Sequence, residues 1–199
     1  MTVNVSCRRV VTALVLVLEV LACSPSPEVP ADYSAPVEVE RPSILLITLD
    51  TTRADALRLD SDDPVAPRIA SLAARGVRFT QAYSTVPTTL PSHVSMMTGL
   101  YPAGHGVREN GRRVGLGVEL LAPVLQRIGY ETAGFVSGYP LDSEFGLARG
   151  FGVYNDNFGE GRVERRAGET VEAALEWLSE RGSGPLFLWV HLFDPHDPY

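Results

Sequence analysis

Two continuous apolar runs constrain the fold of this chain more than any other feature of its sequence. Residues Ser43 to Leu49 and Pro185 to Phe193 are rich in β-branched and aromatic side chains and lack the alternation of a half-exposed strand. Runs of this length are typical of strands that are buried on both faces, as in a parallel sheet covered by helices. The sequence therefore predicts a sheet with helices on both of its faces.

Helical and extended stretches alternate between these two runs. Amphipathic periodicity, glycines at the expected helix ends and short alternating stretches mark the elements. Helices are predicted over residues 67–74, 92–100, 120–128 and 169–181, and further strands over residues 77–83 and 132–136. Strands that alternate with helices imply a layered α/β fold.

The charge of the chain excludes one class of partner. Its 17 basic and 24 acidic residues give a net charge of -7, so bulk electrostatics recruit neither nucleic acid nor an anionic membrane surface. All the basic residues are arginines, and the chain has no lysine. A G+C-rich genome explains this bias without a functional cause. Any mechanism that requires a lysine must nevertheless obtain it elsewhere.

The first 22 residues have the features of a secretory signal peptide. Arg8 and Arg9 precede a short apolar stretch from Val10 to Ala22, whereas a helix that spans a membrane needs about 20 apolar residues. The residues VLAC, which end at Cys23, resemble a bacterial lipobox. This resemblance implies cleavage before Cys23 and lipidation of its thiol. An ordinary cleaved signal peptide is the alternative.

The proline-rich residues 23–42 are predicted to form an extended tether between this lipid and a folded domain over residues 43–199. Cys7 lies in the signal and Cys23 carries the lipid, so the domain has no thiol for a disulfide or a thiolate metal site. We therefore expect an exported protein of the bacterial envelope that is anchored to the membrane only through its N-terminal lipid.

Three polar clusters lie where a sheet of this kind binds ligands. They span residues 50–53, 88–93 and 191–196. The first and the third lie at the ends of the two apolar runs, and the second lies at the predicted start of a helix. Because ligand sites in open α/β sheets lie beyond the carboxyl ends of strands, these clusters are candidates for one site.

Five pieces of the chain carry a family signature: ILLITLDTTRADAL, RGVRFTQAYS, TTLPSHVSMMTGLYPAGHGV, ELLAPVLQRIGYETAGFVSG and FLWVHLFDPHDPY. In this order they resemble the N-terminal half of sulfatases and of their relatives in the alkaline phosphatase superfamily. The resemblance covers most of residues 43–199 and implies an alkaline-phosphatase-like layered α/β fold. It also implies that the chain is truncated and holds about half of such a domain.

The resemblance assigns the central chemistry to Asp50 and Thr89. In that family an aspartate after the first strand binds a divalent metal, and the nucleophile lies two residues before a Pro-Ser pair. Sulfatases use a formylglycine there, which a threonine cannot become, whereas a threonine alkoxide can attack phosphorus. A metal held by Asp50 and Thr89 lowers the pKa of the hydroxyl, and N–H groups at the helix start favour a tetrahedral anion. The alternative for Thr89 is a plain helix N-cap.

Two further residues lie near this nucleophile in the sequence. His93 replaces the arginine that completes the sulfatase signature, and it either contacts substrate oxygens or stabilises the helix start. Asn110 has the spacing of an asparagine that binds a phosphoryl oxygen in nucleotide phosphodiesterases. The pair Asn110-Gly111 is also a favoured tight turn, and both interpretations stay open.

The remaining histidines fall in motifs of the same resemblance. His196 fits the histidine that contacts the ester oxygen or the leaving group, with His191 and Asp194 as weaker candidates. His105 is expected to brace a turn. We therefore predict that Thr89, His93 and His196 are catalytic and that Asn110 and His191 bind substrate.

Departures from the sulfatase pattern favour a phosphate ester over a sulfate ester as the substrate. Thr51 stands where many sulfatases have a second metal-binding aspartate, and residues 137–139 read Ser-Gly-Tyr where sulfatases hold sulfate with a lysine and a histidine. The leading hypothesis is a metal-dependent hydrolase of small or polymeric sulfate or phosphate esters that forms a covalent intermediate on Thr89. The ion is Ca²⁺ if the enzyme is sulfatase-like, and Zn²⁺ or Mn²⁺ if it is phosphodiesterase-like.

Two alternatives accompany this hypothesis. One is an envelope transferase that moves a phosphoryl-linked group between lipids or glycans. The other is a truncated, non-catalytic lipoprotein, because the remaining metal ligands of the family are expected beyond Tyr199.

Overall fold

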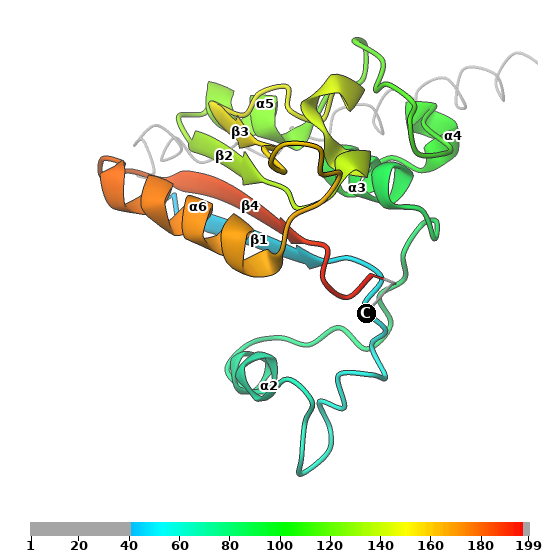
Figure 1. Cartoon of the computed structure of the whole chain (residues 1–199), viewed down its shortest axis with the longest axis vertical. Helices are drawn as coiled ribbons and strands as arrows, with labels where there is room; N and C mark the ends of the chain where they lie inside the picture. Colours follow the sequence, from blue (N-terminus) through cyan, green and yellow to red (C-terminus); the bar gives the residue numbers. More distant parts are fainter. Residues whose placement is uncertain (1–40, 197–199) are drawn as a thin grey trace, which may run out of the picture. The chain divides into compact units, whose positions relative to one another are not determined.

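A computed structural model describes residues 41–196 of the chain. Parallel strands form one sheet in the order β1-β4-β2-β3, so the first and last strands are neighbours (Figure 1). The strands are β1 (Ile44–Leu49), β2 (Glu131–Phe135), β3 (Val153–Asn155) and β4 (Leu186–Leu192). The helices are α2 (Pro67–Ala73), α3 (Thr89–Thr98), α4 (Pro102–His105), α5 (Leu121–Arg127) and α6 (Ala167–Glu180), with short 3₁₀ helices η1 (Tyr139–Leu141) and η2 (Ser143–Phe145).

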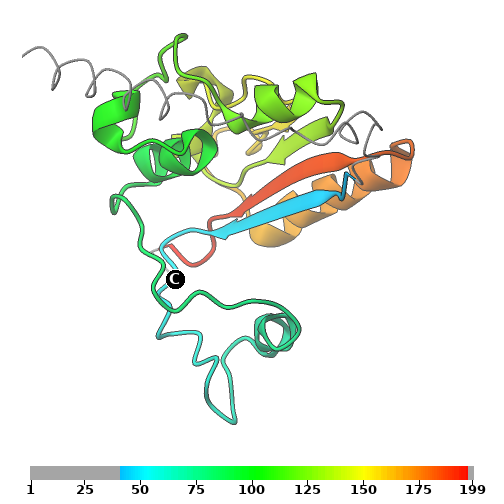
Figure 2. The same ribbon diagram turned by 180° about the vertical axis from the view of Figure 1, so that it is seen from behind.

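Helices cover both faces of the sheet, with α6 on one face and α3 and α5 on the other (Figures 1 and 2). The side chains of the central strand β4 alternate between two apolar clusters. Phe187 and Trp189 belong to the larger cluster, which also contains residues of α3 and α5. Leu188 and Val190 pack in the smaller cluster with Ala174 of α6. The predicted layered α/β fold with helices on both faces of the sheet is therefore confirmed.

Two elements differ from their prediction. Helix α3 begins at Thr89 rather than at Ser92. Pro91 is tolerated inside the first turn because the N–H groups there have no acceptor within the helix. Residues 77–83, predicted as a strand, form none, because no strand of the described chain lies beside them to accept and donate the backbone hydrogen bonds. The short elements β3 and α4 have too few residues for a periodic signal, and the sequence does not predict them.

Strand β1 also differs from the prediction of burial on both faces. Leu45 and Ile47 are 60% and 51% exposed, although they lie level with the buried Leu188 and Val190 of β4. The reason is the position of β1 at the edge of the sheet. Helix α6 packs on β4 and β2 and leaves this face of β1 open within residues 41–196.

The predictions for the N-terminus lie outside the described residues. They are the signal peptide over residues 1–22, the lipidation of Cys23 and nearly all of the tether over residues 23–42. Within the described part of the chain, the structure contains no helix of the length and apolar character that a membrane span requires.

Candidate active site

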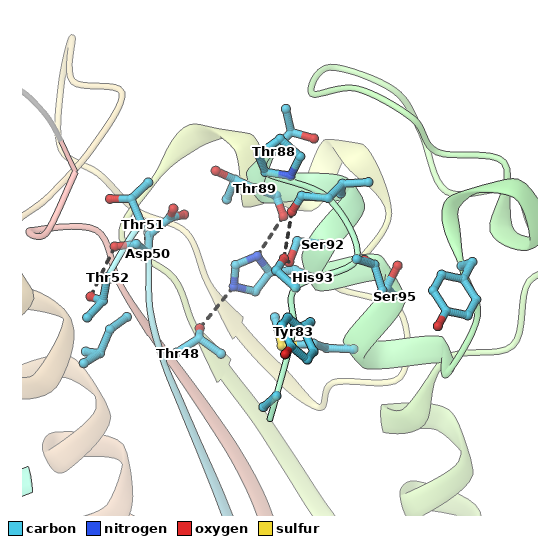
Figure 3. A pocket seen from close by; sticks show the side chains of 18 of the residues that line it. Thr48, Asp50, Thr51, Thr52, Tyr83, Thr88, Thr89, Ser92, His93 and Ser95 are labelled. Carbon is cyan, nitrogen blue, oxygen red and sulfur yellow. Dashed lines mark hydrogen bonds between the residues drawn. The ribbon is translucent and has the colours of Figure 1, made fainter. Parts of the chain in front are cut away.

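Asp50 and Thr89 meet at the carboxyl end of the sheet (Figure 3). Asp50 directly follows β1, and its N–H donates to the Leu192 carbonyl at the end of β4, 2.9 Å away. Thr89 is the first residue of α3, and its side chain lies close enough to the Asp50 carboxylate to lower the pKa of that group. Both side chains are nearly buried, with 7% of Asp50 and 9% of Thr89 exposed. The two residues that the sequence places at the centre of the chemistry therefore lie in contact.

The Asp50 carboxylate is ionised despite its burial. Burial raises its pKa, but the hydrogen bond with His191, with a smaller contribution from the nearby Thr89 side chain, outweighs burial and holds the pKa below the ordinary value of 3.8. The His191 Nε2 lies 3.1 Å from the Asp50 Oδ2. A hydroxyl that donates to an ionised carboxylate keeps its lone pairs available for attack on an electrophile.

The start of α3 offers fewer anion-binding N–H groups than the sequence predicts. The Leu90 N–H donates to the Asn110 Oδ1 at 2.9 Å, Pro91 has no N–H, and the Ser92 N–H donates to the Thr88 carbonyl at 3.1 Å. Among the described residues, nothing accepts from the N–H of Thr89 in this first turn. The N-cap is Thr88, and its side chain makes no capping bond. The nucleophile candidate is therefore the first helical residue and not the cap.

Asn110 lies in the predicted tight turn, and its side chain also reaches the start of α3. Gly111 has a φ of 78°, as the tight turn requires, because only glycine adopts this region without strain. The side chain of Asn110 nevertheless reaches the start of α3, where its oxygen accepts from Leu90. Its amide nitrogen therefore keeps its hydrogens for other acceptors next to Thr89.

His93 lies beneath Thr89 and is linked to two strands (Figure 3). Its Nδ1 lies 2.8 Å from the Thr89 carbonyl oxygen, and its Nε2 lies 3.2 Å from the Thr48 Oγ1 of β1. The Trp189 Nε1–H of β4 donates to the same Thr48 oxygen at 3.1 Å. Burial lowers the pKa of His93 to about 4, so the ring is neutral at neutral pH.

His191 lies at the end of β4 and is fully buried. Besides Asp50, it contacts Ser137, whose N–H donates to the His191 Nδ1 at 3.4 Å and whose hydroxyl donates to the His191 carbonyl at 2.6 Å. The sequence does not single out Thr48, Ser137 or Trp189. The signal for Thr48 is a hydroxyl inside an apolar strand, but only the pairing of β1 with β4 shows what that hydroxyl serves.

The other predicted residues lie at the margin of this cluster. His196 stacks on Phe193 with ring centroids 4.4 Å apart, and its loop is joined to the Asp50 loop by a hydrogen bond of 3.0 Å from the Thr51 Oγ1 to the Pro195 carbonyl. Thr51 has a φ of 51°, a strained conformation for a β-branched residue. Asp194 instead accepts from the Ala167 N–H at 2.7 Å, so it caps α6.

His105 braces a turn, as expected. The Val107 N–H donates to its Nδ1 at 3.2 Å, and the Ser95 hydroxyl lies 3.0 Å from its Nε2. This imidazole therefore stabilises the chain between α3 and α4 and lies outside the contact of Asp50 with Thr89.

A cavity of about 880 Å³ opens beside Asp50 and Thr89, a size suited to a small organic ligand. Polar residues line it near the end of β1, and Tyr83, Met96 and Tyr101 line it farther along α3. Asp50 is the one ionised side chain among the lining residues of the described chain. An anionic ligand in this cavity therefore faces a negative carboxylate without a protein cation to balance it.

The described residues do not by themselves fit a divalent ion. Asp50 and Thr89 supply two kinds of oxygen donor, and one Asp50 oxygen is already bound to His191. Within residues 41–196, no group of three or more histidine, cysteine or acidic side chains is arranged to hold a metal. Zn²⁺ needs about four ligands and Ca²⁺ about six to eight, so two donors do not form a complete site.

Comparisons with known proteins agree with the motifs of the chain. A protein-family model described as Sulfatase matches residues 42–199. YidJ of Escherichia coli (strain K12), described as an uncharacterized sulfatase, is 27% identical over 154 residues, which are 76% of this chain and 28% of YidJ. The ectonucleotide pyrophosphatase/phosphodiesterase family member 3 of Rattus norvegicus is 32% identical over 95 residues, which are 47% of this chain and 10% of that protein. The chain thus spans less than a third of either relative.

A solved structure has a similar fold. It is a protein in complex with its substrate D-glucosamine-2-N,6-O-disulfate, and it superposes with a TM-score of 0.67 at 21% sequence identity. The superposition covers 79% of this chain and 35% of that one. At this identity the likeness shows a shared fold.

Proposed function

The chain belongs to the sulfatase family, and on that premise we propose that it acts as a hydrolase of sulfate or phosphate esters with Thr89 as its nucleophile. The placement of the Thr89 side chain beside the ionised Asp50 carboxylate, where both line a cavity, carries this proposal. Asp50 orients the hydroxyl and accepts its proton as the new bond forms. Thr89 Oγ bonds to the phosphorus or sulfur, the bond to the departing oxygen breaks, and water then hydrolyses the enzyme ester.

A phosphate ester is the favoured substrate. Threonine cannot be converted to formylglycine, and the sulfate-binding lysine and histidine of ordinary sulfatases are replaced near Ser137, which holds His191 instead. The similarity to a nucleotide phosphodiesterase supports the same choice. Asn110 supports it further, because its amide hydrogens can donate to a phosphoryl oxygen beside Thr89.

His196 is proposed to donate a proton to the leaving oxygen. Its ring is held against Phe193, and its loop is tied to the Asp50 loop through Thr51. An imidazole whose ring plane is fixed by stacking can present one nitrogen to a departing group. The proposed acid therefore lies in a loop that is hydrogen-bonded to the loop of Asp50.

A divalent cation is proposed to complete the site. The ionised Asp50 repels an anionic ester, and the lining residues provide no positive charge to offset it. A cation bound by Asp50 and Thr89, with further ligands from outside residues 41–196, balances this charge. Ca²⁺ and, for a phosphodiesterase, Zn²⁺ or Mn²⁺ are the ions to test.

Hydrolysis by the whole protein tests the function. Turnover of an aryl phosphodiester and an aryl sulfate is measured after dialysis against a chelator and addition of each ion. We expect Thr89→Ala to lower kcat/KM by about 10³-fold or more, and the exposed Thr80→Ala, a matched control outside the cavity, to leave it unchanged. Undiminished turnover by Thr89→Ala contradicts the assignment of Thr89 as the nucleophile. Transfer to an added alcohol in preference to water identifies a transferase instead.

Export and lipid anchoring remain a separate proposal. The VLAC segment that ends at Cys23 supports it. We expect the protein to incorporate radiolabelled fatty acid in a bacterial host and Cys23→Ser to incorporate none. Labelling of the Cys23→Ser variant, or a labelled wild type whose lipid is elsewhere, contradicts the proposal.

A further inference from the structure

We propose that His93 and His191 are a positioning pair that uses opposite ring nitrogens, His93 holding Thr89 through its Nδ1 and His191 holding Asp50 through its Nε2. Both rings are buried, with 5% of His93 and none of His191 exposed; His191 is not among the lining residues of the cavity, and His93, which lines it, has both ring nitrogens hydrogen-bonded to Thr89 and Thr48. They act on the reaction only through Thr89 and Asp50, whose roles are those of the proposed function.

The contacts of His93 fix its proton on Nδ1. The Thr89 carbonyl oxygen, 2.8 Å from Nδ1, can only accept a hydrogen bond, so Nδ1 must carry the hydrogen. On the other side, the Thr48 oxygen accepts from the Trp189 indole, and because the neutral His93 ring has its one hydrogen on Nδ1, its Nε2 accepts from the Thr48 hydroxyl. A bare Nε2 is the acceptor that this hydroxyl needs. His93 is therefore the Nδ1–H tautomer.

The contacts of His191 fix its proton on the other nitrogen. The Asp50 carboxylate is an acceptor, so the His191 Nε2 that faces it at 3.1 Å must carry the hydrogen. The Ser137 N–H is a donor, and it faces the His191 Nδ1, which must be bare to accept it. His191 is therefore the Nε2–H tautomer.

The two rings also touch each other. Their centroids are 5.0 Å apart at an interplanar angle of 84°, an edge-to-face arrangement. A turned His93 would present the wrong nitrogen to Thr89, and a turned His191 would present a bare nitrogen to the Asp50 carboxylate.

The pair therefore joins β1 and the start of α3, two elements that are distant in the sequence. His93 ties the first turn of α3 to β1 through Thr48 and to β4 through Trp189. His191 ties the residue after β1 to β4 and to Ser137. A nucleophile on a helix and its carboxylate on a strand end are held at hydrogen-bond distance only if the helix start cannot shift against the sheet.

Nitrogen NMR of the whole protein, labelled with ¹⁵N-histidine, reads the tautomers directly. We expect His93 to show a protonated Nδ1 with a bare Nε2, and His191 to show the reverse pattern. His105, whose Nδ1 accepts from the Val107 N–H, is an internal reference for the Nε2–H form. The same tautomer in both rings, or averaged signals from exchanging tautomers, overturns the proposal whether or not the protein is active.

Substitutions that mimic one nitrogen at a time give the functional test. The amide of asparagine lies near the place of Nδ1, and that of glutamine near the place of Nε2. We expect His93→Asn to keep kcat within about tenfold of wild type and His93→Gln to lose about 10- to 100-fold. At His191 the order reverses, with Gln retained and Asn impaired. KM changes little in all four variants, because the nitrogens of both rings are hydrogen-bonded to the protein rather than to substrate.

Controls distinguish a loss of positioning from misfolding and from the general cost of losing a buried imidazole. Far-UV circular dichroism checks that each variant folds, and His105→Gln, outside the site, checks the cost of losing a buried imidazole. An equal loss for Asn and Gln at both positions, or a change in KM alone, contradicts the positioning pair. If instead Thr89→Ala remains active, the proposed function fails, while the tautomers measured by NMR still decide the state of the two rings.

Discussion

The cluster around Asp50 and Thr89 and the segment of residues 53–86 carry adjacent pieces of the same family signature, yet they differ in packing. In the cluster, buried side chains hold one another through hydrogen bonds from β1, β4 and α3. In the segment, α2 has no buried residue and Val77, Phe79 and Tyr83 are exposed. The similarity of a segment to the family motifs therefore does not show whether the described residues bury that segment. The same chemical change in each region should have very different effects.

The largest difference is expected for an aspartate-to-asparagine change. Asp50→Asn removes the charge that orients the Thr89 hydroxyl and accepts from His191, and we expect kcat to fall by about 10²-fold or more. Asp55→Asn, in the exposed segment, breaks only its ion pair with Arg53, and turnover should stay within about twofold. Steady-state kinetics of the two variants provide the measurement. An Asp50→Asn enzyme as active as wild type excludes Asp50 from the reaction.

The next effect is the loss of a core leucine in α3. Leu90 is fully buried beside Thr89, and Leu90→Ala should lower the free energy of unfolding by about 2–5 kcal/mol. Urea denaturation followed by circular dichroism measures the change. A loss below about 1 kcal/mol would mean that the start of α3 repacks easily, which is incompatible with a rigid nucleophile.

A pH-dependent effect of about 3 kcal/mol is expected from His93. Its folded pKa of about 4 lies below the ordinary 6.5, so the unfolded chain takes up the proton first as the pH falls. Stability is therefore complete above pH 6.5 and declines between pH 6.5 and 4. His105, whose pKa burial also lowers, adds in the same direction. Urea midpoints of wild type and His93→Asn, measured across this pH range, give the contribution of His93 to the pH dependence of stability. The same pH dependence in both proteins would contradict this contribution.

The smallest effect is expected in the exposed segment. Leu72 of α2 is 62% exposed, and Leu72→Ala should change the free energy of unfolding by less than about 0.5 kcal/mol. The same urea experiment as for Leu90→Ala applies. Destabilisation by about 2 kcal/mol would show that α2 packs against residues outside 41–196.

Much of the site was predictable because its residues follow the ends of strands. Asp50 after an apolar run and Thr89 before Pro91 are local patterns, and the structure brings the two into contact. The start of α3 was predicted too late, since Pro91 reads as a helix opener although it fits inside the first turn. The roles of His93 and His191 as substrate-facing groups or structural ones were not decidable from spacing, because burial depends on elements distant in the chain.

Strands β1 and β4 illustrate the same limit for the fold. Both read as apolar runs that end in a polar cluster, and the sequence alone determined that they are strands of a covered parallel sheet. Only the order β1-β4-β2-β3 decided that β4 is a central strand and that β1 is an edge strand with an open face.

The sequence by itself determined the layered fold, the family and the chemical identity of Asp50 and Thr89. The tertiary structure decided which nitrogen of each histidine carries a proton and which hydroxyl, indole or amide fixes it. The physical reason is that hydrophobic periodicity is a local property of the chain. The direction of a buried hydrogen bond depends on which groups from β1, β4 and α3 meet in one small volume.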